Sequence, residues 1–170
     1  KIRKELKLEN KFKKGSANFV FLIKEGMPMF GEFCELVPGP CGPELMSTAS
    51  GLVLKSDDSS IFVLTAAHFC DESKEPNLIF KENIYGFAGD EIRKLFVIDM
   101  DKENDICLLI GPKKTNDNFY NIKLADNFTI GEDVYTVAAP LGIGGPGNRL
   151  IFTGQLAGCN EEGCLTTVPA

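Results

Sequence analysis

The stretch TAAHFC (residues 65–70) contains the only histidine of the 170-residue chain. It directly follows SSIFVL (59–64), a short run rich in β-branched and aromatic residues that is typical of a buried strand. His68 is therefore expected where a strand ends, a position at which a rigid scaffold often holds functional residues. A lone histidine can be a buried structural residue, a metal ligand or a general base, and its position alone does not decide between these.

The remainder of the chain predicts an all-β protein. Short apolar runs are separated by clusters of Gly, Pro, Asn and Asp, a pattern that indicates a β-sandwich or barrels. The break at GFAGD (86–90) divides the runs into two groups. We therefore predict a basic N-terminal arm (1–14), a first barrel that carries His68 (15–90) and a second barrel region (91–170). The strand-like runs are 18–23, 51–54, 60–67, 77–80, 94–99, 105–110, 133–139, 149–158 and 164–168.

Charge and composition exclude several classes of partner. The net charge is -6, which argues against a nucleic-acid partner. No apolar run reaches the roughly 20 residues that span a bilayer, so no membrane partner is expected. Residues 1–14 carry seven Lys or Arg against two Glu, and a solvated arm is favoured over one that binds an acidic surface. The chain begins at Lys1 with no recognisable signal peptide, so its localisation is left unassigned.

No cofactor or metal is predicted. Six cysteines permit disulfides, and both Cys34 with Cys41 and Cys159 with Cys164 flank turn-like inserts that such bonds could close. Their spacings are not those of usual zinc sites. The glycine-rich segment 142–148 is followed by a strand-like run rather than a helix, so we interpret it as a loop between strands and not as a phosphate-binding loop.

Asp105 is the candidate partner of His68. It opens the strongly apolar run DICLLI, and a carboxylate at the mouth of a buried strand is costly unless it is paired. An imidazole N–H is a suitable partner, and such an Asp would fix the tautomer of the His and stabilise its protonated form. The alternative interpretation of Asp105 is a turn or strand-edge residue.

TAAHFC followed by NDICLLI resembles the His and Asp motifs of the chymotrypsin-like (trypsin-like) serine proteases. Three later segments are similar to the second barrel of that family, above all in its HtrA-like branch: residues 131–145, 152–158 and 166–170. The resemblance extends from about residue 16 to the C-terminus. It implies two β-barrels with an active site in the cleft between them, and a second barrel that is incomplete in this chain.

The resemblance also implies roles for individual residues. His68 would be the general base and Asp105 its orienting partner, acting on a nucleophilic serine that hydrolyses peptide bonds through an acyl-enzyme. That serine and its oxyanion hole would come last in the chain, whereas all seven serines here precede Asp105. We therefore interpret the chain as carrying the His and Asp of a trypsin-like serine endopeptidase but not its Ser. A cysteine nucleophile at Cys159 or Cys164 is disfavoured, because neither is followed by the required glycine.

An inactive protease-fold module in a larger assembly, such as a viral particle, is the alternative function. The expected partners are a polypeptide substrate and a segment or companion chain that supplies the serine, and a virion is one setting for them. The resemblance also makes Cys70 a half-cystine. Its usual partner position falls at residues 48–50, which contain no cysteine, so we expect it to be reduced or to pair differently, for example with Cys34 or Cys41.

Overall fold

The computed structural model describes residues 17–28, 44–71, 80–88, 91–123, 125, 127–138, 150–160 and 163–168. The arm 1–14, the pair Cys34 and Cys41, and the glycine-rich segment 142–148 lie outside the described residues. No helix in the described part of the chain is long and apolar enough to cross a membrane. The described elements are β1 (Phe19–Pro28), β2 (Glu44–Ser56), β3 (Ser60–Thr65), α2 (Ala67–Cys70), β4 (Phe80–Ala88), β5 (Glu91–Asp101), β6 (Ile106–Pro112), β7 (Asp133–Ala138), β8 (Leu150–Asn160) and β9 (Gly163–Thr166).

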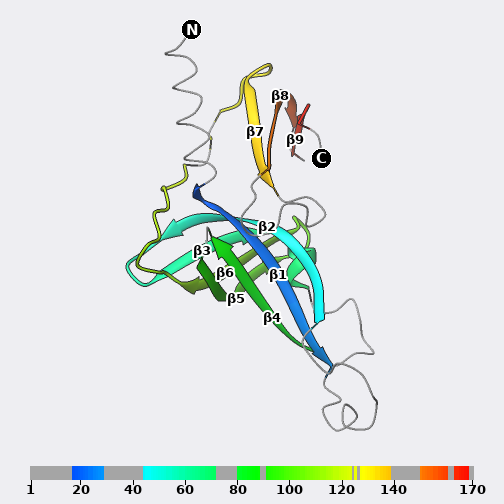
Figure 1. The fold of residues 1–170 in the computed structure, drawn as a ribbon. Coiled ribbons are helices and arrows are strands. Elements are labelled where there is room, and N and C mark those ends of the chain that lie inside the picture. Colours follow the sequence, from blue (N-terminus) through cyan, green and yellow to red (C-terminus); the bar gives the residue numbers. More distant parts are fainter. Residues whose placement is uncertain are drawn as a thin grey trace.

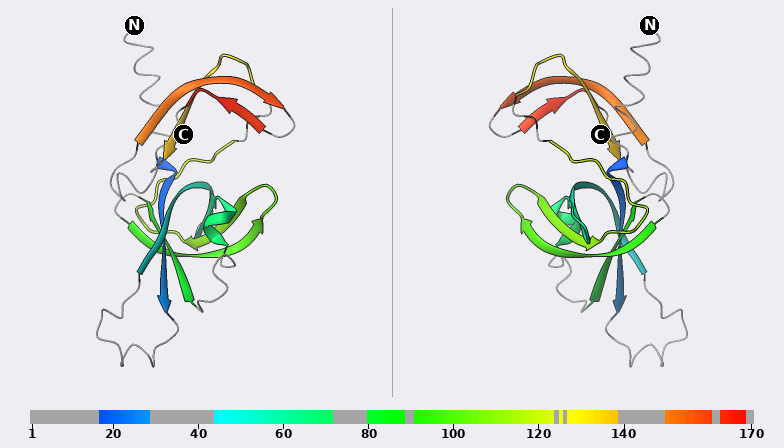
Figure 2. Two further views of the ribbon diagram at one scale, coloured as in Figure 1. Left: turned by 90° about the vertical axis from the view of Figure 1, so that its right-hand side faces the viewer. Right: turned by 90° about the vertical axis from the view of Figure 1, so that its left-hand side faces the viewer.

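The described strands form a closed antiparallel barrel and a separate sheet (Figure 1). The barrel has the strand order β1-β2-β3-β6-β5-β4, and the sheet has the order β7-β8-β9. In Figure 2 the sheet lies above the barrel, with β8 (orange) curving over it. Closure pairs every barrel strand on both sides and leaves no free edge.

The boundary between the two units differs from the prediction. We placed it at residue 90, but β5 and β6 belong to the first barrel, which therefore extends to Pro112. Ala88 of β4 pairs with Glu91 of β5, so the break in the apolar pattern is a tight hairpin within one barrel. Hairpin turns and linkers between domains share the same Gly- and Asp-rich composition, which explains the error.

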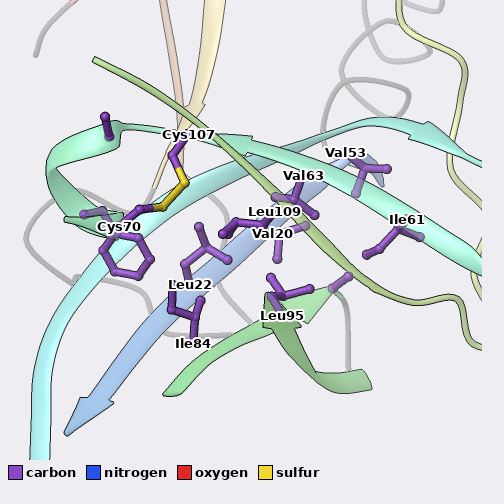
Figure 3. Close-up of a cluster of buried hydrophobic side chains, with 13 residues drawn as sticks. Val20, Leu22, Val53, Ile61, Val63, Cys70, Ile84, Leu95, Cys107 and Leu109 are labelled. Atoms are coloured by element: carbon purple, nitrogen blue, oxygen red, sulfur yellow. A yellow bond between two sulfur atoms is a disulfide. The ribbon is translucent and has the colours of Figure 1, made fainter. Parts of the chain in front are cut away.

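The barrel interior is filled by residues at alternate strand positions (Figure 3). Along β3, buried and half-buried residues alternate strictly, as expected for a strand with one face on the core. Full burial of each Val, Leu or Ile contributes about 1.5–3 kcal/mol. The cluster comprises Val20, Leu22, Val53, Ile61, Val63, Ala67, Phe69, Cys70, Ile84, Ala88, Leu95, Cys107 and Leu109.

Two buried polar side chains fasten the segment that follows β6 to the barrel. Arg93 binds the carboxylate of Asp117 through both terminal nitrogens, at 2.5 and 2.8 Å. The Asn18 side chain donates to the carbonyls of Val53 and Tyr120, each at 2.7 Å, and accepts from the Tyr120 N–H at 2.9 Å. These contacts hold the segment from 113 to 120 against the barrel after β6.

The second sheet contacts the barrel through β7. Val137 packs against the buried Phe19 and Phe21 of β1. A pocket of about 280 Å³ lies beside this contact, between β7 and strands β1, β2 and β3. Its lining residues are Phe19, Ser50, Gly51, Leu52, Leu64, Tyr135, Thr136 and Val137.

Candidate active site

His68 lies on a single helical turn at the end of β3. The chain leaves the strand after Thr65, passes through an extended Ala66, and forms α2 with bonds from the Phe69 N–H to the Ala66 carbonyl and from the Asp71 N–H to the Ala67 carbonyl. The other three side chains of α2 are buried. The turn therefore buries its small, aromatic and sulfur-containing residues and presents the imidazole to solvent.

Asp105 lies at the end of the turn that joins β5 to β6. The Asp101 carboxylate organises this turn by accepting the backbone N–H groups of Glu103 and Asn104, each at 3.1 Å, and the side-chain amide of Asn104 at 2.7 Å. Asp105 itself has a φ of 53°, in the left-handed region that non-glycine residues rarely adopt. Such a conformation costs on the order of 1 kcal/mol and persists where surrounding contacts enforce it.

The two candidate residues are in direct contact. His68 Nδ1 lies 2.8 Å from Asp105 Oδ2 and 3.0 Å from Oδ1. The backbone N–H of His68 donates to the same Oδ1 at 2.9 Å, and the N–H of Ala67 donates to the Asp105 carbonyl at 3.1 Å. Because an ionised carboxylate can only accept, these contacts place the imidazole proton on Nδ1 and leave the lone pair on Nε2. We call His68 and Asp105 the dyad.

Hydrogen bonding keeps the Asp105 carboxylate ionised. The backbone N–H and the imidazole of His68 lower the pKa of Asp105 below its ordinary value. The dyad is also open to water, with side-chain exposures of 62% for His68 and 53% for Asp105. Among the described residues, none forms a hydrogen bond with His68 Nε2, so this nitrogen can accept a proton from a group that approaches from solvent.

The geometry answers the alternatives left open by the sequence. His68 is exposed and is not a structural histidine of the core. In the described part of the chain, no group of three or more His, Cys, Asp or Glu residues could hold a metal ion. Asp105 is a turn residue and a partner of the imidazole at once. Neither residue lines the pocket between the barrel and β7.

Sequence reasoning missed one covalent feature beside the dyad. Cys70 forms a disulfide with Cys107, so the expectation of a free thiol or a bond to Cys34 or Cys41 is wrong. The reason is local: Cys107 occupies an inward-facing position of β6 and pairs in register with Thr65, the last residue of β3. The signal was present, because Cys70 and Cys107 each follow a dyad residue by two positions.

Of the two bonds that the sequence leaves open, the one between Cys159 and Cys164 is present. The two residues are register partners of β8 and β9, and the disulfide closes the hairpin between these strands. We refer to it as the hairpin cystine and to Cys70–Cys107 as the dyad cystine.

The comparisons with known proteins identify the fold. No protein-family model matches the chain, and no curated protein matches it. Among solved structures, the crystal structure of Deg5 superimposes with a TM-score of 0.67 and 13% sequence identity, covering 98% of this chain and 75% of the other. The fold is chymotrypsin-like. The predicted all-β, chymotrypsin-like class is therefore confirmed, and a likeness at this level of identity establishes the fold alone.

Proposed function

We propose that the dyad is the general base and its orienting carboxylate in a trypsin-like serine endopeptidase. The observation that carries this proposal is the exposed imidazole whose Nδ1 is bound to a carboxylate while no described residue forms a hydrogen bond with its Nε2. A carboxylate, an imidazole and a free Nε2 in this order are the arrangement that activates a hydroxyl nucleophile. The chymotrypsin-like fold supports the proposal, because it is the fold of the serine proteases whose His and Asp motifs this chain resembles.

The proposed steps follow from the proton positions. Nε2 of His68 takes the proton of a serine hydroxyl as its oxygen attacks the peptide carbonyl, and Asp105 stabilises the imidazolium. His68 then gives that proton to the leaving amine, which separates as the acyl-enzyme forms. In the second half the same Nε2 takes a proton from water, and the attack of the water oxygen releases the carboxylic acid and returns the proton to the serine.

No serine follows Asp105 in this sequence, so in this proposal the nucleophile comes from elsewhere. We propose that it belongs to a continuation of this chain or to a companion chain, together with the backbone N–H groups of the oxyanion hole. Its Oγ must come within about 2.6–3.2 Å of His68 Nε2 in the reacting complex. A polypeptide is the substrate class that this chemistry takes.

A fluorophosphonate probe applied to the protein at its full natural length tests the proposal. We expect one serine to be labelled, and we expect His68→Ala to abolish the labelling. Asp105→Asn should lower kcat for peptide hydrolysis by about 10⁴-fold, because the Asn amide N–H would donate to Nδ1 and shift the imidazole proton to Nε2, where it blocks the base. Glu103→Gln is the matched control, since this exposed residue of the same turn uses only its backbone N–H.

The alternative function predicts the opposite outcome. If the protein is an inactive protease-fold module of a larger assembly, no serine reacts at any chain length. Labelling that persists in His68→Ala would also contradict the proposed base. In either case the dyad would be a structural pair on a chymotrypsin-like barrel.

A further inference from the structure

We propose that the dyad cystine is a positioning element that holds the imidazole of His68 in the tautomer and orientation required by Asp105. Cys70 and Cys107 are separated by 37 residues, as are His68 and Asp105. The disulfide and the dyad hydrogen bonds therefore connect the same two segments of chain, two residues apart on each side. The inference rests on the proposed function for its importance, but its test requires no nucleophile.

The segment that carries His68 depends on such a connection. The β3–β6 ladder ends at the pair Thr65 and Cys107, so α2 lies beyond the last ladder pair. A single helical turn is a costly nucleus and has little stability of its own. Its position is therefore set by its buried side chains and by its links to the Asp105 turn.

The polar links between the two segments lie largely at the surface. In the described part of the chain they include the hydrogen bonds from the N–H groups of Ala67 and His68 to Asp105, and an ion pair between Lys102 and Asp71 at 2.9 Å. The Lys102 side chain is 54% exposed, and exposed ion pairs contribute little. By contrast, Cys70 and Cys107 are 4% and 0% exposed, and their bond belongs to the core cluster (Figure 3).

Asp105 adds a reason for a covalent link. Its left-handed backbone has a conformational cost, and relaxation of the turn would move the carboxylate away from Nδ1. Anchoring Cys107 to Cys70 fixes the start of β6 directly under α2. The disulfide thus limits the two motions that would separate the pair, displacement of the helical turn and relaxation of Asp105.

The single histidine makes the test direct. In protein labelled with ¹⁵N-histidine every imidazole signal comes from His68, and the two ring nitrogen shifts report its tautomer. We compare the wild-type chain with C70A/C107A, and with C159A/C164A as the matched control that removes the hairpin cystine. At alkaline pH we expect one Nδ1–H tautomer in the wild type and the control, and averaged shifts of two tautomers in C70A/C107A.

Amide exchange provides the second measurement. We expect the His68 and Ala67 amides to exchange at least about tenfold faster in C70A/C107A through local opening, whereas Val63 and Leu109 in the barrel core lose protection only in step with the global stability of that variant. A purely structural role would lower core protection alone, and would leave the tautomer and the local opening at His68 unchanged wherever the barrel is folded. A single tautomer with unchanged His68 exchange in C70A/C107A overturns the proposal.

A chemical reduction keeps the test decisive if C70A/C107A does not fold. The phosphine TCEP converts the disulfide to two thiols and becomes a phosphine oxide with oxygen from water, so both sulfur atoms remain in the core. Reduction of C159A/C164A, verified by alkylation and mass mapping of Cys70 and Cys107, then gives the same two readouts. Failure of protease activity would leave these results unaffected, so the two proposals can fail separately.

Discussion

Asp117→Asn should destabilise the protein by about 3 kcal/mol, although the residue lies in a loop. The side chains of Arg93 and Asp117 are 0% and 3% exposed, and the two are joined by both guanidinium terminal nitrogens. Removing one partner of a buried ion pair leaves an uncompensated charge, which costs about 3–5 kcal/mol. Arg93→Met should cost at least as much. Asp117 would keep its charge but would lose both bonds to the guanidinium, and of the contacts described here only the one from the Lys114 N–H would remain.

The double variant R93M/D117L separates this charge effect from a general loss of packing. Two apolar side chains of similar volume leave no buried charge, so we expect its stability to lie within about 1 kcal/mol of the wild type. R93M/D117L forms a thermodynamic cycle with the single variants Arg93→Met and Asp117→Leu, and we expect a coupling of several kcal/mol in that cycle. Urea denaturation followed by circular dichroism gives each free energy of unfolding.

The pH dependence supplies an independent check. Burial alone would raise the pKa of Asp117, but hydrogen bonds from Arg93 and from the Lys114 N–H, with the nearby charges of Arg93 and Lys113, lower it below its ordinary value. A carboxyl whose pKa is lowered in the folded state stabilises the protein fully above its unfolded pKa of about 3.9, and this contribution is lost as the pH falls through the folded pKa. The stability difference between wild type and Asp117→Asn should therefore narrow below about pH 4.

Two results would refute this reasoning. One is a double variant whose cost equals the sum of the single costs, since that would mean no coupling between the charges. The other is a stability difference that persists unchanged at low pH. Other carboxyls with lowered pKa, such as Asp57 and Asp101, are present in both proteins and cancel in the comparison.

Three further perturbations test the fold. Removing the dyad cystine should lower the free energy of unfolding by about 4 kcal/mol and removing the hairpin cystine by about 2 kcal/mol, because the bonded residues are 37 and 5 positions apart. Urea denaturation of C70A/C107A and C159A/C164A compares the two losses. Equal losses would contradict this reasoning. Asn18→Ala should cost about 3 kcal/mol, because this buried side chain makes three hydrogen bonds. Urea denaturation measures the loss, and a value below about 1 kcal/mol would count against the reasoning. In Gly111→Ala the new methyl group would overlap Leu95 Cδ2, so the variant should lose about 1–3 kcal/mol of stability. Gly158→Ala is the control, because its methyl group would meet open space, and it should be nearly neutral. Similar melting temperatures for the two variants would exclude overpacking at Gly111.

The local pattern predicted most of the strands and the two residues of the dyad, although β4 (Phe80–Ala88) overlaps the predicted run 77–80 only at Phe80. Alternation and turn residues identified an all-β chain, and β3 and β6 begin and end within a few residues of the predicted runs. His68 and Asp105 were found because each closes or opens an apolar strand, where an unpaired polar group is unfavourable. These signals lie within short windows of sequence and need no knowledge of distant contacts.

Features set by long-range pairing were not predictable in the same way. The assignment of β5 and β6 to the first barrel depends on which strands pair, and the turn after Ala88 has the same composition whether it joins a hairpin or two domains. The dyad cystine depends on the β3–β6 register, which places Cys107 opposite Thr65. Cys70 and Cys107 each follow a dyad residue by two positions, so this spacing predicts the disulfide once His68 and Asp105 are assumed to be in contact.

The corrected boundary changes how the dyad is understood. With β5 and β6 in the first barrel, the described groups that hold the dyad all come from residues 44–112: the end of β3, α2, the turn organised by Asp101, and the dyad cystine. In the described part of the chain, the second sheet meets the barrel at Val137 and at the pocket, and neither includes His68 or Asp105. The two residues of the dyad are therefore assembled by one closed barrel, and the serine nucleophile that we propose must be brought to an imidazole that this barrel already presents to solvent.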